Sequence, residues 1–263
     1  MHLFSLKLPV IRKKDPLIDI IIQELKADNK KIKEGDIVVI SEKVVATSQG
    51  RIINLNEIMD ISEKAKNLAT KYNMDPRYVQ VILNESSSIL GGMHHVILAK
   101  MDGLMIANAG IDQSNAGGQD NVVLLPENLT NTVKQYRNRL KNEFNIENLG
   151  IIIADSRVQP LRKGTIGVSI ASTGFEPVED LRGDPDLFGR SLEITMRAVA
   201  DDLTSAAQFL LNEGSQKTPV VVIRNAPVQF TENPLMTTEL SPEKCLYMNI
   251  FSKYLLKKKE RQD

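Results

Sequence analysis

Cysteine, histidine and tryptophan are scarce among the 263 residues, and each shortage excludes a class of site. Cys245 is the single cysteine, which excludes an intrachain disulfide and any zinc or iron–sulfur centre built from several cysteines. Three histidines cannot easily supply both a zinc site and a catalytic base. Tryptophan is absent and aromatic residues make up 5%, too few for a surface that stacks single-stranded nucleic acid. An enzyme built from this chain would therefore rely on carboxylates, hydroxyls and main-chain groups.

Excess charge and long apolar runs are also missing. Lysine and arginine total 33, as do aspartate and glutamate, so no net charge steers the chain to nucleic acid or an anionic membrane. No apolar run approaches the roughly 18 residues that a membrane span needs. Lys7 and the basic residues 12–14 interrupt the N-terminal apolar stretch, which is not the pattern of a signal peptide. The sequence predicts a cytoplasmic protein with neither nucleic acid nor membrane as a partner.

Apolar patterning predicts helices and strands mixed without strict alternation. Helices are expected over about 17–25, 56–71, 129–144, 190–213 and 242–259, with another beginning at Asp75-Pro76. Strands are expected over about 37–40, 94–100, 104–107, 151–153, 165–171 and 220–223. The strands on either side of Asp102-Gly103 would form a hairpin, with His94 and His95 on opposite faces of the first. This order favours an α+β fold with mixed sheets and packed helices over a doubly wound parallel sheet.

No repeat or long Pro/Gly/Ser linker divides the chain. We expect one domain over residues 1–240, as a single body or as two interleaved subdomains. Residues 241–263 would form a C-terminal helix with a basic tail.

Two segments carry acidic residues after apolar strands. Asp112, in the segment Ala107–Asn115 that precedes Gly117-Gly118, can ligate a divalent cation, and Asn115 can contact a nucleotide. The alternative is an Asx-rich turn capped by its own side chains. Asp155 and Ser156 end the run that begins at Ile151, a usual arrangement for holding Mg²⁺ beside phosphates. The alternative there is an aspartate that caps the following turn.

Two further segments are open to both interpretations. Arg182 and Arg190, each beside a glycine, could bind phosphate or carboxylate, or could belong to a loop tied by surface ion pairs. Gly214 fits the stop of a long helix, but Glu213 is then a carboxylate at a helix C-terminus, where a bound cation would remove an unfavourable interaction. No P-loop and no G-x-G-x-x-G motif follows a strand, so the standard phosphate cradles are absent from the sequence.

These ordered segments together resemble the F420-0:L-glutamate ligase family, the γ-glutamyl ligases of deazaflavin coenzyme biosynthesis. The resemblance runs from the segment Leu8–Ile11 to Pro219–Val221. Its most specific stretches are Ala107–Asn115, Asp155-Ser156, Asp180–Gly183 with Gly189-Arg190, and Ala198–Asp202.

The resemblance implies a GTP-dependent ligase with an intertwined α+β fold that forms a homodimer. Such an enzyme joins L-glutamate to the terminal carboxylate of F420-0 and then adds a second glutamate by a γ-linkage. It uses Mg²⁺ or Mn²⁺ and is helped by K⁺.

Carried over by position, the resemblance makes Asp112 and Asp155 the catalytic carboxylates and gives a metal-binding set of Asp112, Asp155, Ser156 and Glu213. Where the family has a Ser-Thr pair and a following lysine, this chain has Glu42, Lys43 and Thr47, and Glu42 would repel phosphate unless a cation intervenes. The implied nucleotide contacts are Leu8, Pro9, Val10, Ile11, Glu42, Lys43, Thr47, Asn115, Leu211, Asn212, Glu213, Gly214, Ser215, Gln216, Lys217 and Thr218.

The expected chemistry suits a chain poor in histidine and cysteine. A carboxylate must be activated before it forms an amide in water, and transfer of the GTP γ-phosphate would give an acyl phosphate that the glutamate amine then displaces. Positioning and charge neutralisation would carry this reaction without an enzyme nucleophile. The alternatives are a ligase of the same fold that acts on another carboxylate, a non-catalytic GTP-binding relative, and an interaction protein whose aspartates are only caps.

Overall fold

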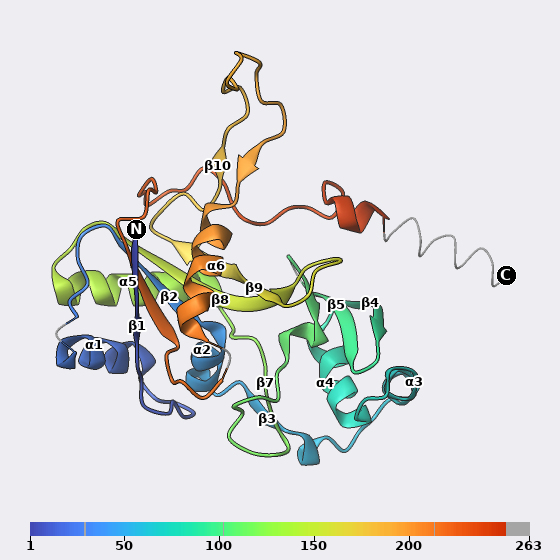
Figure 1. The fold of residues 1–263 in the computed structure, drawn as a ribbon. Coiled ribbons are helices and arrows are strands. Elements are labelled where there is room, and N and C mark those ends of the chain that lie inside the picture. Colours follow the sequence, from blue (N-terminus) through green and yellow to red (C-terminus); the bar gives the residue numbers. More distant parts are fainter. Residues whose placement is uncertain (29, 102, 213, 251–263) are drawn as a thin grey trace. The chain divides into compact units, whose positions relative to one another are not determined.

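The computed structural model describes residues 1–28, 30–101, 103–212 and 214–250, and the chain divides into two compact units. Unit 1 contains residues 1–53 and 112–238, and unit 2 contains residues 54–111 and the chain from 239 onwards. Unit 1 is therefore assembled from two stretches of sequence on either side of unit 2, as the colours of Figure 1 show.

A five-stranded mixed sheet forms the centre of unit 1 (Figure 1). Its order is β1-β12-β2-β8-β9, and β2 and β8 are its only parallel pair. The strands are β1 (His2–Leu6), β12 (Val220–Arg224), β2 (Asp36–Ser41), β8 (Leu149–Val158) and β9 (Thr165–Thr173). All-apolar stretches such as Ile37–Ile40 form central strands here because both faces of the sheet are covered.

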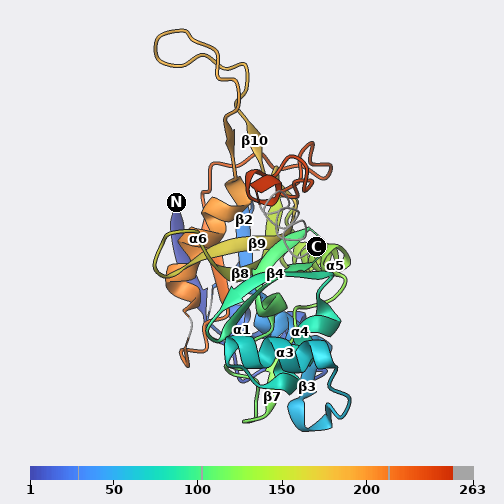
Figure 2. The same ribbon diagram turned by 90° about the vertical axis from the view of Figure 1, so that its right-hand side faces the viewer.

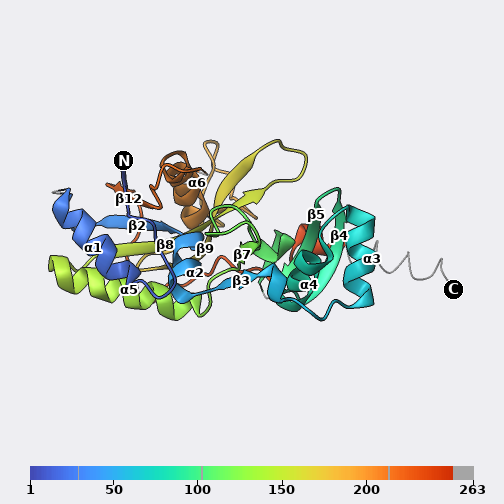
Figure 3. The same ribbon diagram turned by 90° about the horizontal axis from the view of Figure 1, so that it is seen from below.

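Helices cover both faces of this sheet, and a separate hydrophobic core lies on each face. Successive side chains of a strand point alternately into one core and the other. Val38 and Ile40 of β2 face the core beneath α1 (Leu17–Ala27) and α5 (Leu129–Phe144). Ile37 and Val39 face the opposite core, beneath α6 (Val199–Leu211). Figure 3 shows α1 and α5 on one side of the sheet and α6 on the other.

Three smaller elements complete unit 1. Helix α2 (Glu42–Gln49) starts directly after β2, and β3 (Ile52–Asn54) pairs with β7 (Asn121–Val123). Strands β10 (Glu179–Asp180) and β11 (Met196–Arg197) are the base of an arm, residues 179–197, that extends from the start of α6 (Figure 2).

Residues 54–111 of unit 2 form a three-stranded antiparallel sheet and two α-helices. Helix α4 starts as the sequence predicts, because the Asp75 carboxylate caps it by accepting from Arg77 N at 2.8 Å, and Pro76 opens its first turn. The elements are η1 (Leu55–Glu57), α3 (Glu63–Tyr72), α4 (Pro76–Glu85), β4 (Ser88–Met93), β5 (Val96–Met101), β6 (Leu104–Ala107) and η2 (Asn108–Gly110). Of the helix predicted over 242–259, residues 246–250 are helical and residues 242–244 form a turn, while residues 251–263, with the basic tail, lie outside the described residues.

The predicted α+β class is confirmed, as is the β5–β6 hairpin, although Asp102 at its turn lies outside the described residues.

Three local predictions are wrong. The helix expected over 190–213 is α6 alone, because residues 190–197 belong to the arm. The helix expected over 56–71 is a short η1 followed by α3. His94 and His95 lie in the turn between β4 and β5, with ring centroids 3.8 Å apart, so they do not occupy opposite faces of a strand. No described helix is long and apolar enough to span a bilayer.

Candidate functional site

One edge of the five-stranded sheet gathers most of the residues that the resemblance singles out. The last residue of β1, Leu6, pairs with Val220 at the start of β12, and Val220 pairs with Ile40 near the end of β2. The parallel neighbour β8 brings Ala154 beside Ser41. Segments 8–11, 41–43, 155–156, 211–212 and 214–218 therefore meet at this edge, which we call the site edge, although they are far apart in sequence.

Glu42 stands at the turn from β2 into α2, where Ser41 Oγ donates to its carboxylate at 3.2 Å. Burial, together with the negative charge of Asp155, raises the pKa of Glu42 to about 8. Lys43 opposes this shift without cancelling it. The carboxylates of Glu42 and Asp155 therefore repel each other when both are ionised. Protonation of one of them, or a bound cation, would remove this repulsion.

Lys43 links α2 to the segment that follows unit 2. Its Nζ lies 2.5 Å from Asp112 Oδ2 and donates to Ser114 Oγ at 2.8 Å. Burial opposes ionisation of Asp112, but the hydrogen bonds from Lys43 and from Ser114 N outweigh it, so the pKa of Asp112 lies below its ordinary value. Ser114 N donates to Asp112 Oδ1 at 2.7 Å, so this aspartate also closes the Asx turn that was the alternative interpretation.

Asp155 belongs to a chain of charges that the sequence analysis missed. The side chain of Asp155 is buried, and its Oδ2 lies 3.5 Å from Arg157 Nε. The charge of Arg157 also acts on Asp201, in the first turn of α6, although burial dominates and keeps the pKa of Asp201 raised. Asp201 accepts from Ser169 N at 2.9 Å, which ties α6 to β9. Alternation along β8 places residues 155 and 157 on one face, and that regularity could have identified Arg157.

Ser156 is half-buried, and its backbone N–H donates to Asp155 Oδ1 at 2.7 Å. Thr47 lies one helical turn after Lys43 on α2. Asn115 is exposed with a left-handed φ of 56°. These positions place the three residues at or near the sheet end without assigning them a ligand.

The segments before β12 and after β1 lie side by side. Leu8 N donates to Lys217 O at 3.0 Å, with Leu8 buried and Pro9 and Val10 exposed. Thr218 is buried and donates to Leu210 O at 2.9 Å, which closes the loop after α6. The remaining predicted contacts are half-buried Ile11, buried Leu211 and exposed Asn212, Gly214, Ser215, Gln216 and Lys217.

The predicted helix stop at Gly214 is wrong, because α6 ends at Leu211 and Asn212 takes the cap position with a φ of 60°. Glu213, predicted as a metal ligand, lies outside the described residues.

At the site edge, Glu42 and Asp155 are two carboxylates near enough to affect each other's ionisation. Within the described ranges, no three acidic, histidine or cysteine side chains come together as a metal cluster. Asp112 is paired with Lys43 and Asp155 with Arg157, whereas the charges of Glu42 and Asp155 oppose each other, and carboxylate oxygens are ligands of Mg²⁺ in proteins. The structure therefore groups Asp155 with Glu42, which was predicted only as a nucleotide contact.

What the edge offers chemically is a pair of adjacent carboxylates, a lysine and an arginine at the ends of buried strands. Buried strands on either side fix the backbone from which these side chains project. The lysine and the arginine can attract anionic groups, and the carboxylates can attract a cation.

Comparison with known proteins identifies the family of the chain. The sequence model of the F420-0:Gamma-glutamyl ligase family matches residues 5–225. Similar proteins include the coenzyme F420:L-glutamate ligase of Methanopyrus kandleri, 39% identical over 82% of this chain and 84% of that protein. The coenzyme F420:L-glutamate ligase of Methanothermobacter thermautotrophicus is 36% identical over 84% of this chain and 86% of that protein. That of Methanocaldococcus jannaschii is 36% identical over 76% of this chain and 79% of that protein. The chain belongs to the F420-0:gamma-glutamyl ligase family of enzymes.

Proposed function

We propose that this protein is a GTP-dependent ligase that joins L-glutamate to the terminal carboxylate of F420-0 and then adds a second glutamate by a γ-linkage. The observation that carries the proposal is the site edge, where Glu42, Lys43, Asp112 and Asp155 approach one another from three parts of the chain. Its relatives' names, which specify coenzyme F420 and L-glutamate, supply the acceptor and the amino acid.

The reaction balances without an enzyme nucleophile. A carboxylate oxygen of the acceptor takes the γ-phosphate of GTP, which gives an acyl phosphate and GDP. The glutamate nitrogen then attacks the acyl carbon, the bond to phosphate breaks, and one amide and inorganic phosphate result while the amine loses its protons to solvent or to a base. Every reactant is anionic, so the protein's contribution is to gather and neutralise negative charge.

Residues at the site edge divide this work. Asp155 and Glu42, with the hydroxyl of Ser156, would hold Mg²⁺ or Mn²⁺, which when bound offsets the charge of the phosphates. Lys43 is held in place by Asp112 and would face the same phosphates as a fixed positive charge. Segments 8–11 and 211–218, together with Thr47 and Asn115, would contact the nucleotide, and K⁺ would assist as the family resemblance implies.

A mass-spectrometric assay with F420-0, L-glutamate, GTP and Mg²⁺ or Mn²⁺ tests the proposal. We expect a product heavier by one or two glutamyl units, with GDP released only when every component is present. The variants Asp112→Ala and Asp155→Ala should lose this turnover while retaining the wild-type melting temperature within a few degrees. Asp60→Ala, an exposed aspartate of unit 2, is the matched control and should remain active.

The assay also separates the alternatives. GTP that raises the melting temperature without glutamylation of F420-0 would indicate another acceptor or a non-catalytic relative. Absence of both effects would contradict the proposal as a whole.

We also propose that the protein is a homodimer and that the arm, residues 179–197, contacts the second copy. The arm has an apolar tip, with Leu187 92% and Phe188 90% exposed, and Ile194 85% exposed nearby. Near its base, Arg182 donates to Asp180 at 2.8 and 2.6 Å, and β10 pairs with β11. An ordered arm that presents apolar side chains to water is typical of an association surface.

A further inference from the structure

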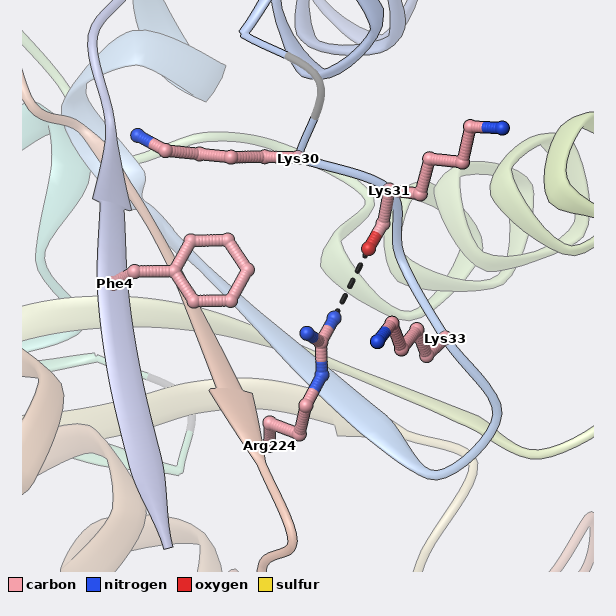
Figure 4. A pocket seen from close by; sticks show the side chains of 5 residues that line it. All are labelled: Phe4, Lys30, Lys31, Lys33 and Arg224. Atoms are coloured by element: carbon pink, nitrogen blue, oxygen red, sulfur yellow. Dashed lines mark hydrogen bonds between the residues drawn. The ribbon is translucent and has the colours of Figure 1, made fainter.

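A basic hollow lies at the end of the five-stranded sheet opposite the site edge. Here β1 and β2 begin and β12 ends, with His2 paired to Arg224 and Ile37 to Ile223. The hollow has a volume of about 370 Å³ and is lined by Phe4, Lys30, Lys31, Lys33 and Arg224. In Figure 4 the Phe4 ring, the Arg224 guanidinium and the Lys33 side chain surround one space, while the Lys31 side chain extends away from it.

Arg224 is fixed in a position that leaves part of its guanidinium for a ligand. Its Nε and Nη2 donate to the fully buried carboxylate of Asp36 at 2.9 and 2.7 Å, and Nη2 also donates to Lys31 O at 3.0 Å. Within the described part of the chain, no hydrogen bond engages Nη1. The guanidinium also lies over the Phe4 ring, 5.4 Å from its centroid, so its orientation is set from two sides.

The lysines give the hollow an excess of positive charge. Lys30 pairs with Asp28 at 3.0 Å, and Asp36 balances Arg224. Lys31 and Lys33 are exposed and have no ion-pair partner among the residues described. Among the described residues around the space with its one aromatic wall, Lys33 is thus unpaired, Arg224 keeps Nη1 available, and Lys30 is held only by Ser5 O at 3.3 Å and by the half-exposed Asp28 carboxylate.

We propose that this hollow is a second ligand site, which binds a small organic polyphosphate through Lys30, Lys33 and Arg224 and places the flat part of that ligand against Phe4. The charge calls for an anion with more than one negative group, and the fixed guanidinium favours the oxygens of a phosphate. The volume suits a molecule of nucleotide size. The aromatic wall favours a ligand with a ring over inorganic polyphosphate. This inference concerns a part of the sheet that the proposed ligase reaction does not use.

Methyl NMR can test this site separately from the site edge. Ile32 lies between two of the lining lysines and Ile153 lies two residues before Asp155, so their methyl resonances report on opposite ends of the sheet. We expect titration of the full chain with tripolyphosphate, and separately with ATP, to shift the Ile32 resonance until it saturates. ATP should bind more tightly than tripolyphosphate. Added salt should weaken both because the binding is electrostatic.

Matched variants complete the experiment. Lys30→Ala/Lys33→Ala should weaken both ligands about tenfold or more at the Ile32 reporter, and Phe4→Leu should remove the preference for ATP. Lys64→Ala/Lys134→Ala removes two exposed lysines elsewhere and should leave binding unchanged. An Ile32 resonance that does not respond, or one that responds equally in the wild type and in Lys30→Ala/Lys33→Ala, would overturn the inference, whatever happens at Ile153.

Discussion

Glu42 illustrates how a single side chain acquires its properties from strand order. The parallel pairing of β2 with β8 places it near Asp155, so that burial and a second carboxylate both oppose its charge. In an isolated peptide the same residue would be an ordinary glutamate. Its raised pKa follows from burial and from its neighbour across the sheet.

Replacing Glu42 tests whether it shares a cation with Asp155. Glu42→Gln keeps the size and the hydrogen bond from Ser41 but cannot ionise, so it cannot supply the negative charge that a bound cation would draw from Glu42. We expect the Mg²⁺ concentration for half-maximal turnover to rise about tenfold, a usual loss when a metal site loses a supporting group. Glu57→Gln, on an exposed turn of unit 2, should leave the requirement unchanged. An unaltered metal requirement in Glu42→Gln would remove Glu42 from the cation site.

Arg137 and Glu232 give a prediction about pH and stability. Arg137 is buried and donates to Glu232 at 2.5 and 2.8 Å, and this lowers the pKa of Glu232 below its ordinary value of 4.5. Because the folded pKa is depressed, the pair stabilises the protein above the unfolded pKa and loses this effect as the pH falls through the folded pKa.

Urea unfolding of Glu232→Gln at two pH values measures this effect. At pH 7 we expect a loss of roughly 1 kcal/mol, discounted because the Glu232 side chain is 64% exposed. Below about pH 4 the difference from the wild type should shrink. A difference that stays constant with pH would show that the carboxylate charge is not involved.

At the scale of elements, the contact between α6 and β9 depends on a glycine. A Cβ on Gly167 would lie 2.6 Å from Thr204 O, and Ser205 Oγ donates to Gly167 O at 2.7 Å. The close approach brings the first turn of α6 to β9, where Asp201 accepts from Ser169 N.

Gly167→Ala should therefore push α6 outward and destabilise the protein by about 1–3 kcal/mol, as overpacking usually does. The lowered midpoint should appear in urea or thermal unfolding. Gly91→Ala places its new methyl in open space and serves as the control. Equal midpoints for the two variants would contradict the close packing of α6.

The elements that sequence predicts well are those with strong local periodicity. Each of β2, β8, β12 and α5 is recognisable in the sequence, because the apolar residues that it buries recur in a regular local pattern. The arm was mistaken for helix because residues 190–197 contain no glycine or proline to interrupt the pattern. Strand β1 was missed because its pairing with β12, more than 200 residues away, is what makes it a strand.

The whole molecule decides which site residues meet. Asp112 and Asp155 could be singled out as acidic residues after apolar runs, but Lys43 and Asp112 are 69 residues apart, and no local pattern predicts their 2.5 Å contact. The pairing of Glu42 with Asp155 likewise needs the sheet order. Sequence could name candidates, whereas tertiary structure assigned their neighbours.

Association of two copies is the prediction at this scale. Leu187→Ser/Phe188→Ser should convert a dimer into a monomer in sedimentation velocity, because it removes the apolar tip of the arm without touching either core. We expect the dissociation constant to rise about a hundredfold. Leu235→Ser changes another exposed leucine of unit 1 and should leave the dimer intact. A wild type that sediments as a monomer, or a dimer that persists in the double variant, would contradict the role of the arm.

The interlaced strand order also bears on when the protein can fold during its synthesis. Strand β12 separates β1 from β2, so neither of these N-terminal strands has this neighbour until residues 220–224 have left the ribosome. Pairings of such high contact order form slowly, and exposed strand edges invite aggregation in the meantime. The sheet that would carry both proposed ligand sites is therefore completed late, and nascent chains shorter than about 220 residues should depend on chaperones to remain in solution.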